Sequence, residues 1–227
     1  MKIGVLGTGS VAKIVAGKLG ADGHDVKIGT RDVKATLARN EPDMAGLPPL
    51  RTWLETNTRV SVGTHAEAAK HGALVVNALS GTGALEGLES AGADALADKI
   101  LIDISNPLDF SKGFPPSLTV SNTDSLGERI QKALPKTKVV KALNTVAAPL
   151  MVDPRQLAGG EHTMIVCGDD AAAKAEVTRI LKEWFGWKDV IDLGDITNAR
   201  GTEMWLPLWV RLYGALKTPL FGMKVVR

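Results

Sequence analysis

Short apolar runs alternate with helical patterns along the first two thirds of the chain. Apolar and β-branched residues fill six short segments that we expect to be strands: residues 2–6, 25–29, 59–62, 73–78, 100–104 and 138–143. Between them apolar residues recur every three or four positions, as in residues 11–19, which is typical of helices. Strands that alternate with helices pair in parallel under two layers of helices. The pattern therefore predicts an α/β fold with a doubly wound parallel sheet.

The alternation changes after Asn144. Residues 163–167 and 190–193 are strand-like, and residues 202–216 predict a long apolar helix. Residues 171–183 predict another helix, which Asp169 and Asp170 are placed to cap. We therefore expect a main domain of residues 1–145 and a smaller C-terminal α/β extension of residues 146–227.

Composition narrows the class of protein. The 227 residues are 44% hydrophobic and 23% charged, which excludes disordered and collagen-like chains. A net charge of +2 gives no reason to expect a nucleic-acid partner. No run of about 20 apolar residues predicts a membrane span, and the N-terminal apolar run is too short for a signal peptide. The single cysteine, Cys167, cannot form an internal disulfide, and it fits the cytoplasmic location that we expect.

A glycine-rich turn follows the first predicted strand. Residues 7–12 read GTGSVA, which fits the motif GxGxxA, and they open a predicted helix. The first glycine permits a tight turn, and Gly9 lets the backbone approach a pyrophosphate. The helix N-terminus offers free N–H groups to the phosphates. The motif therefore predicts a Rossmann-type domain that binds a dinucleotide at Gly7 and Gly9. The alternative is a tight turn without a ligand.

The end of the second predicted strand indicates which dinucleotide to expect. Proteins that prefer NAD place Asp or Glu there to bind the ribose 2′-OH. Here Thr30 and Arg31 precede Asp32, and Lys34 follows. A hydroxyl and two cations suit a 2′-phosphate, which forms charge-assisted hydrogen bonds. We therefore predict NADP(H) held by Thr30, Arg31 and Lys34, the alternative being a solvated Arg31–Asp32 pair in a turn.

The chain resembles the NADPH-dependent F420 reductases (F420H2:NADP oxidoreductases) and their bacterial relatives, which share their nucleotide domain with STEAP-type metalloreductases. The resemblance covers nearly the whole chain and is carried by GTGSVAKIVA, GHDVKIGTRD, VVKALNT, VCGDDAAAK and DLGDITNARGTE. The last three stretches are the more specific ones. The resemblance implies phosphate contacts at residues 8–11 and 2′-phosphate contacts at Thr30, Arg31 and Lys34. It also implies that the nicotinamide lies between two groups: Ala78, Leu79 and Ser80, and Ala142 to Asn144.

One departure from this family concerns the second substrate. The archaeal enzymes carry a proline–tryptophan–glutamate turn near the deazaflavin, after the fourth strand. Residues 79–83 of this chain read LSGTG instead. The resemblance therefore predicts a deazaflavin (F420) or flavin-like acceptor without separating the two.

Two asparagines follow predicted strands. Asn106 comes after the fifth strand and Asn144 after the sixth, at the carboxyl ends where open α/β sheets bind ligands. Their amides could orient a carboxamide or a substrate ring. The alternative is turn chemistry, which an Asn–Pro pair such as residues 106–107 favours by itself.

Other polar candidates carry less weight. Tyr213 and Lys217 have the spacing of a short-chain dehydrogenase pair, but the glycine motif is of another type, so we assign them no role. Arg200 precedes the last predicted helix and could face either the cleft or solvent. The four histidines have no zinc-ligand spacing, so we expect no metal and polar surface positions for them: His24, His65, His71 and His162.

The last predicted helix carries more large apolar side chains than one buried stripe needs. They are either the core of the C-terminal extension or a seam between two copies, and we predict a homodimer with Trp209 in the seam. The large apolar residues are Met204, Trp205, Leu208, Trp209, Leu212 and Tyr213.

We therefore predict an NADP(H)-dependent oxidoreductase that transfers a hydride between NADPH and a deazaflavin or flavin-like acceptor. Hydride transfer between two rings needs positioning rather than an acid or base, so we name no catalytic residue. One alternative is an imine or β-hydroxyacid reductase, for which Lys141 would be the proton donor. The other is a non-catalytic NADP(H)-sensing module.

Overall fold

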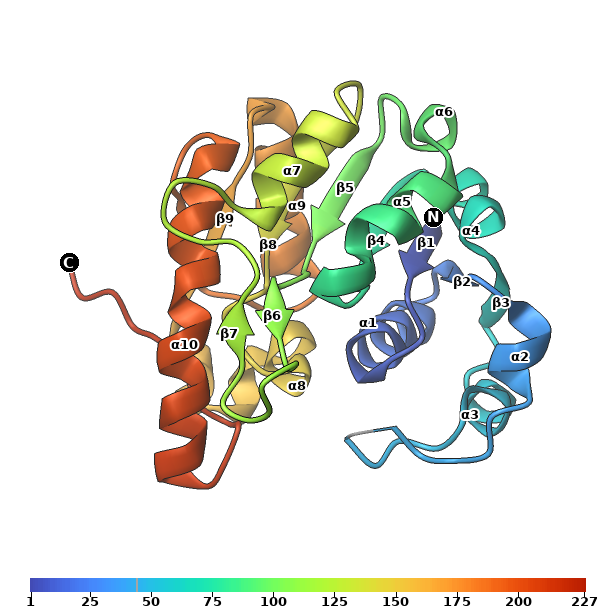
Figure 1. Cartoon of the computed structure of the whole chain (residues 1–227), viewed down its shortest axis with the longest axis horizontal. Coiled ribbons are helices and arrows are strands. Elements are labelled where there is room, and N and C mark those ends of the chain that lie inside the picture. Colours follow the sequence, from blue (N-terminus) through green and yellow to red (C-terminus); the bar gives the residue numbers. More distant parts are fainter. Residues whose placement is uncertain (44) are drawn as a thin grey trace.

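The computed structural model describes residues 1–43 and 45–227 (Figure 1). In these residues one sheet has eight strands in the order β10-β9-β8-β5-β4-β1-β2-β3, and a small hairpin pairs β6 with β7. The strands are β1 (Lys2–Leu6), β2 (Asp25–Thr30), β3 (Val60–Thr64), β4 (Leu74–Asn77), β5 (Ile100–Asp103), β6 (Leu108–Asp109), β7 (Ser117–Leu118), β8 (Lys138–Ala142), β9 (Thr163–Cys167) and β10 (Asp189–Asp192).

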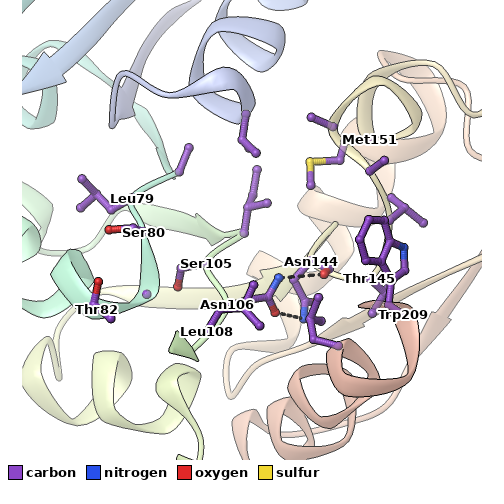
Figure 2. Close-up of a pocket in the computed structure, with 18 of the residues that line it drawn as sticks. Leu79, Ser80, Thr82, Ser105, Asn106, Leu108, Asn144, Thr145, Met151 and Trp209 are labelled. Carbon is purple, nitrogen blue, oxygen red and sulfur yellow. Dashed lines mark hydrogen bonds between the residues drawn. The ribbon is translucent and has the colours of Figure 1, made fainter. Parts of the chain in front are cut away.

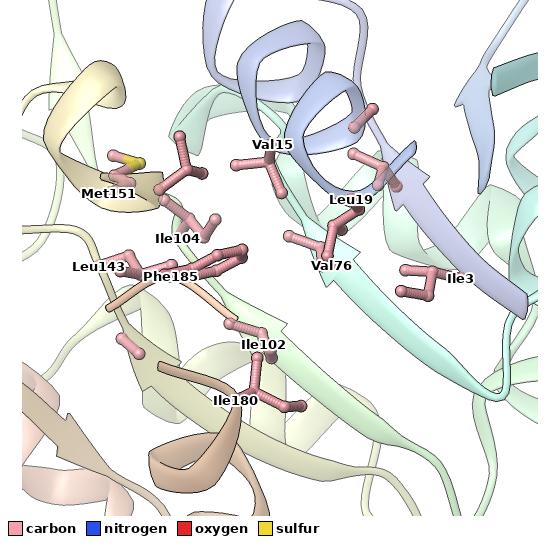
Figure 3. Packing of buried hydrophobic residues seen from close by; sticks show 14 of the residues in the cluster. Ile3, Val15, Leu19, Val76, Ile102, Ile104, Leu143, Met151, Ile180 and Phe185 are labelled. Carbon is pink, nitrogen blue, oxygen red and sulfur yellow. The ribbon is translucent and has the colours of Figure 1, made fainter. Parts of the chain in front are cut away.

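Helices cover both faces of the sheet. One buried cluster joins the sheet to α1, α3, α8 and α9, and Figure 3 shows Val15, Leu19 and Phe185 among its side chains. A second cluster joins the opposite face to α4, α5, α6, α7 and the start of α10. The helices are α1 (Ser10–Ala21), α2 (Val33–Leu37), α3 (Leu50–Thr56), α4 (His65–His71), α5 (Ala84–Ala91), α6 (Ala93–Leu96), α7 (Leu126–Ala133), α8 (Ala148–Val152), α9 (Ala171–Glu183) and α10 (Ala199–Leu216).

The predicted Rossmann-type α/β fold is confirmed. Strands β3-β2-β1-β4-β5-β8 are parallel and have the order of dinucleotide-binding domains, in which ligands bind where the strand order reverses. That point lies between β1 and β4. The glycine turn after β1 and the residues after β4 therefore lie side by side at the carboxyl edge of the sheet.

The expected parallel pairing does not hold for β9. It pairs with β8 in antiparallel register, with Lys141 opposite Cys167, whereas β10 is again parallel to β9. The chain leaves β8 at the carboxyl edge, passes through α8 and enters β9 from that same edge, so β9 must run in the opposite direction. Residues 163–192 thus extend the sheet of the first half, and the division near residue 145 stays a prediction.

The residues after α10 form an extended stretch, residues 217–227, which we call the C-terminal segment. It returns to the start of β9, where the Thr163 N–H donates to the Met223 carbonyl over 2.8 Å. The Val225 N–H donates to Thr163 Oγ1 over 3.0 Å, and the Arg227 guanidinium lies 2.8 Å from Asp189 Oδ1. These contacts attach the segment to the sheet beside α10.

Two smaller expectations need correction. His65 and His162 are buried instead of lying on the surface, because His65 packs under α5 with Nδ1 2.7 Å from Ser90 Oγ and His162 packs edge-on against Trp187. Asp170 does cap α9, whereas Asp169 accepts a hydrogen bond from the Ile196 N–H.

Among the described residues there is no group of three possible metal ligands, and no helix has the length and apolarity to cross a membrane.

We expect Cys167 to be unreactive in the native protein. The residue is fully buried in β9, and burial raises the pKa of its thiol to about 12. The thiolate is the reactive form of cysteine. Because the pKa of this thiol is so high, little thiolate exists at mildly alkaline pH. Ellman's reagent should label almost no thiol in the folded chain and one thiol per chain in guanidinium chloride. Full labelling of the folded protein within minutes would contradict the burial of this strand.

Candidate active site

The glycine turn has the geometry that a phosphate needs. Gly7 has φ +116°, and a Cβ on it would lie 2.6 Å from the Ala78 carbonyl oxygen, so only glycine fits there. Gly9 is the N-cap of α1, and a Cβ on it would have no protein atom within 4 Å. The first turn of α1 carries no acidic side chain. The N-terminus of α1 therefore faces an open space with its positive end, which fits a pyrophosphate.

A polar cleft of about 390 Å³ extends from this turn over the end of β2. Five of the predicted site residues are among those that line it: Gly7, Thr8, Gly9, Thr30 and Arg31. The Asp32 carboxylate accepts the Ala35 N–H over 2.8 Å and so caps α2. A carboxylate already engaged in this way is poorly placed to bind a ribose hydroxyl, which favours the phosphate-bearing dinucleotide.

The cations of this cleft differ in part from the predicted set. Arg31 reaches over the surface to Glu86, 3.3 Å away, and both side chains are about two-thirds exposed or more. Arg39 also lines the cleft, whereas Lys34 is exposed and does not. Sequence reasoning missed Arg39 because it lies two residues beyond the end of α2. The run of basic residues at 31, 34 and 39 was the available signal.

A second pocket of about 540 Å³ adjoins the first at the same edge of the sheet (Figure 2). Ala78, Leu79 and Ser80 line both cavities, so the two meet at the end of β4. Val11, Asn106 and Asn144 line the second pocket as predicted site residues, whereas Ser10 and Ala142 line neither cavity. Residues that were not predicted as site residues complete the wall: Met151 after β8, Phe110 of the β6–β7 hairpin, and Leu206 and Trp209 of α10.

The two asparagines hold one another. Asn144 Nδ2 donates to Asn106 Oδ1 over 3.0 Å and to the Thr202 carbonyl over 3.1 Å. Asn106 Nδ2 donates to the Asn144 carbonyl over 2.9 Å. This reciprocal pair joins the ends of β5 and β8 to α10. It gives the pocket a rigid polar floor, visible in Figure 2 between Ser105 and Trp209.

Lys141 lies outside the pocket, in a buried network. Its Nζ is 2.8 Å from Asp103 Oδ2, 2.8 Å from Glu203 Oε1 and 2.5 Å from the Ser105 carbonyl, so all three N–H donors are used. Burial opposes the charge, but the two carboxylates outweigh it and raise the pKa of Lys141. The ammonium is fully buried and has no access to a substrate. It therefore does not supply the proton donor that the imine-reductase alternative needs.

The other polar candidates also have structural partners. The Arg200 guanidinium forms two hydrogen bonds with the Glu128 carboxylate, at 2.9 and 2.6 Å, and does not line either cavity. Tyr213 stacks on Trp209, and Lys217 ends α10 in the left-handed conformation. Neither of these two residues lines the pocket. None of these three side chains is therefore placed for acid–base chemistry in the second pocket.

Arg31→Ala should reduce the affinity for NADPH about tenfold, or roughly 1.4 kcal/mol, and leave the affinity for NADH nearly unchanged. The reason is that only NADPH carries the 2′-phosphate, which Arg31 can meet at the end of β2. Calorimetric titration with both nucleotides checks this. Arg51→Ala is the matched control, because Arg51 is an exposed arginine of α3 that lines neither cavity. Equal losses for both nucleotides would show that Arg31 does not recognise the 2′-phosphate.

Comparisons with known proteins indicate the family of the chain. Residues 2–107 match the family model described as NADP oxidoreductase, coenzyme F420-dependent. A crystal structure from Arthrobacter sp. FB24, described as a candidate F420-dependent NADP reductase, is 55% identical with a TM-score of 0.94, and each chain covers 100% of the other. Metalloreductase STEAP3 of Rattus norvegicus is 30% identical over 219 residues, which are 96% of this chain and 38% of that protein.

A more distant structure shares the fold alone. The imine reductase of Aspergillus terreus, solved with NADPH4 and dibenz[c,e]azepine, has a TM-score of 0.61 at 14% identity, over 95% of this chain and 62% of its own. The chain belongs to the family of coenzyme F420-dependent NADP oxidoreductases, and it is an NADP-dependent oxidoreductase.

Proposed function

We propose that the protein transfers a hydride between NADPH and the planar ring of a deazaflavin or flavin. The observation that carries this proposal is the second pocket. It adjoins the nucleotide cleft at Ala78, Leu79 and Ser80, and its described lining holds one ionisable side chain, Asp109. The hydrogen bond from the Ser111 N–H, at 2.8 Å, lowers the pKa of that carboxyl. Asp109 is therefore ionised at neutral pH and has no proton to donate.

This lining favours a ring-to-ring hydride transfer over the reduction of an imine or a ketone. Those reductions place negative charge on nitrogen or oxygen and commonly use a positioned proton donor. In a ring-to-ring transfer the protein has only to hold two faces at roughly 3–3.5 Å. The apolar walls and the Asn106–Asn144 pair suit that task, because they orient a ring without titrating.

The residues present fit NADP(H). Gly9 and the N-terminus of α1 would hold the pyrophosphate, because the space above Gly9 is open and the helix end is positive. Arg31 and Arg39 would hold the 2′-phosphate, and the end of β4 would lie along the nicotinamide. When bound, NADPH supplies the hydride. The protein's part is to exclude water from the pocket and to keep the two rings in register.

Stopped-flow oxidation of NADPH tests the proposal with F420, FMN, FAD and riboflavin as acceptors. We expect rapid oxidation with at least one of them and none with a cyclic imine or a ketone. NADPH deuterated at its transferable hydrogen adds a direct readout, because deuterium delivered to the C5 carbon of a deazaflavin is retained. Turnover of the imine or ketone alone would contradict the proposal. Tight NADPH binding with no oxidation by any acceptor would favour a sensing role.

We also propose that the chain forms a homodimer and acts in the cytoplasm. On α10 the exposed large side chains include Met204 and Leu208, 41% and 51% exposed, whereas Trp209 is half-buried and stacks on Tyr213 and Phe221. The seam would therefore involve Met204 and Leu208 beside Trp209. Light scattering at micromolar concentration should give twice the mass of one chain, and Leu208→Glu should give a monomer. A monomeric wild type would reject the seam.

A further inference from the structure

One wall of the acceptor pocket is the indole of Trp209. Figure 2 shows it on the α10 side of the pocket, across from Leu79 and Ser80. The indole stacks on Tyr213 with 5.9 Å between ring centroids and an interplanar angle of 11°. It also stacks on Phe221, at 5.1 Å and 27°. Neither Tyr213 nor Phe221 lines the pocket, so both support Trp209 from outside it.

No hydrogen bond among the described residues fixes the orientation of this indole. Trp187 and Trp205 are each held by a hydrogen bond of 3.0 Å from Nε1 to a backbone carbonyl, of Met151 and Thr145 respectively. In contrast, the Nε1 of Trp209 is buried and has no acceptor among the described residues. A tryptophan without that bond can turn about its two side-chain dihedral angles unless its faces are packed. The rings of Tyr213 and Phe221 supply such packing.

Phe221 is placed by contacts outside α10. It belongs to the C-terminal segment, whose Met223 carbonyl and Val225 N–H bond to Thr163 at the start of β9. The next residue, Gly222, lies so close to His162 that a Cβ on it would be 2.8 Å from the imidazole Cδ2. The segment is thus closely packed directly after Phe221. The sheet, through this segment, sets where Phe221 meets Trp209.

We propose that Phe221 is a positioning residue for the acceptor. By stacking on Trp209 from outside the pocket, it holds the indole in place as the wall beside which the planar acceptor ring binds. The inference rests on the proposed function, because it takes the acceptor to be a flavin or a deazaflavin. It adds that an element which does not touch the acceptor, the C-terminal segment, determines how well the acceptor binds.

Phe221→Leu tests this, since leucine keeps an apolar side chain and removes the aromatic face. We expect the KM and Kd for the flavin or deazaflavin to rise about tenfold, with the Kd for NADPH and the kcat at saturation within about twofold of wild type. Phe221→Tyr keeps the ring and should restore acceptor binding. Leu220→Ala is the matched control, because Leu220 is a neighbouring exposed residue that lines neither cavity. Near-ultraviolet circular dichroism should change in Phe221→Leu and not in Leu220→Ala.

Binding of the oxidised acceptor, followed by quenching of its fluorescence, separates this inference from the proposed function. A wild type that binds the acceptor no more tightly than Phe221→Leu does overturns the inference alone. A parallel loss of NADPH affinity also overturns it, because the role of Phe221 would then be general stability. A wild type that binds neither flavins nor deazaflavins overturns the proposed function and the inference with it.

Discussion

Gly9→Val should lower the affinity for NADPH by roughly a hundredfold or more, about 2.7 kcal/mol, and leave the protein folded. Valine tolerates the extended backbone of Gly9, at φ −77° and ψ −176°, and its side chain would meet no protein atom within 4 Å of Cβ. The new side chain instead fills the space in front of the N-terminus of α1. NADPH titration measures the affinity, and far-ultraviolet circular dichroism checks the fold. A folded variant with ordinary NADPH affinity would reject the phosphate site.

Gly7→Val is the informative comparison, because the same substitution two residues earlier should act on folding. Gly7 has φ +116°, and a Cβ there would lie 2.6 Å from the Ala78 carbonyl oxygen in the neighbouring strand connection. A β-branched residue can adopt this conformation only with strain. We therefore expect an unstable or insoluble protein. The two glycines of one motif would then be separated into a structural position and a ligand position.

Lys141→Met should lower the free energy of unfolding by about 3–5 kcal/mol. Methionine has a similar length, but it leaves Asp103 and Glu203 buried beside one another without a cation. Glu203 also accepts the Leu126 and Gly127 N–H groups at the start of α7, at 2.8 and 2.9 Å, so its displacement would leave these two groups without that acceptor. Unfolding in urea, followed by circular dichroism, measures the loss.

Lys188→Met provides the control for a lysine ion pair at the surface. Lys188 lies 2.6 Å from Glu161 with both side chains more than half exposed, so its removal should cost at most about 1 kcal/mol.

The pKa of Lys141 is raised in the folded chain, so the contribution of its charge to stability is complete below the unfolded lysine pKa of about 10.4. It is lost only as the pH rises through the higher folded value. A similar small loss in both variants would argue that the Lys141 network contributes little.

Much of the fold could be predicted from local pattern. Apolar strands and the glycine turn were enough to predict the parallel sheet, because burial on both faces requires those apolar runs. The direction of β9 could not be predicted in this way, because the apolar pattern of residues 163–167 is the same whichever way the strand runs. Strand direction is decided by the path of residues 143–162, in which α8 keeps the chain at the carboxyl edge.

The candidate site was predictable where contacts are close in sequence. The glycine turn, Thr30 and Arg31 meet within one strand–helix–strand unit, so spacing alone placed them together. The acceptor pocket gathers segments from residue 11 to residue 209. Trp209 lines this pocket because of the way α10 packs. The apolar pattern of α10 does not indicate that packing. Lys141 stood out as a polar residue in an apolar strand, but its partners are distant in the sequence.

The buried network around Lys141 also bears on the order in which the chain can fold during synthesis. Asp103 and Lys141 leave the ribosome well before Glu203, which is residue 203 of 227. Until then the Leu126 and Gly127 amides lack the carboxylate that accepts from them, and Lys141 lacks one of its two counterions. A nascent chain that stops short of α10 therefore carries a partly solvated ammonium at the edge of its core. The ammonium becomes fully buried only when α10 packs and brings Glu203 to it.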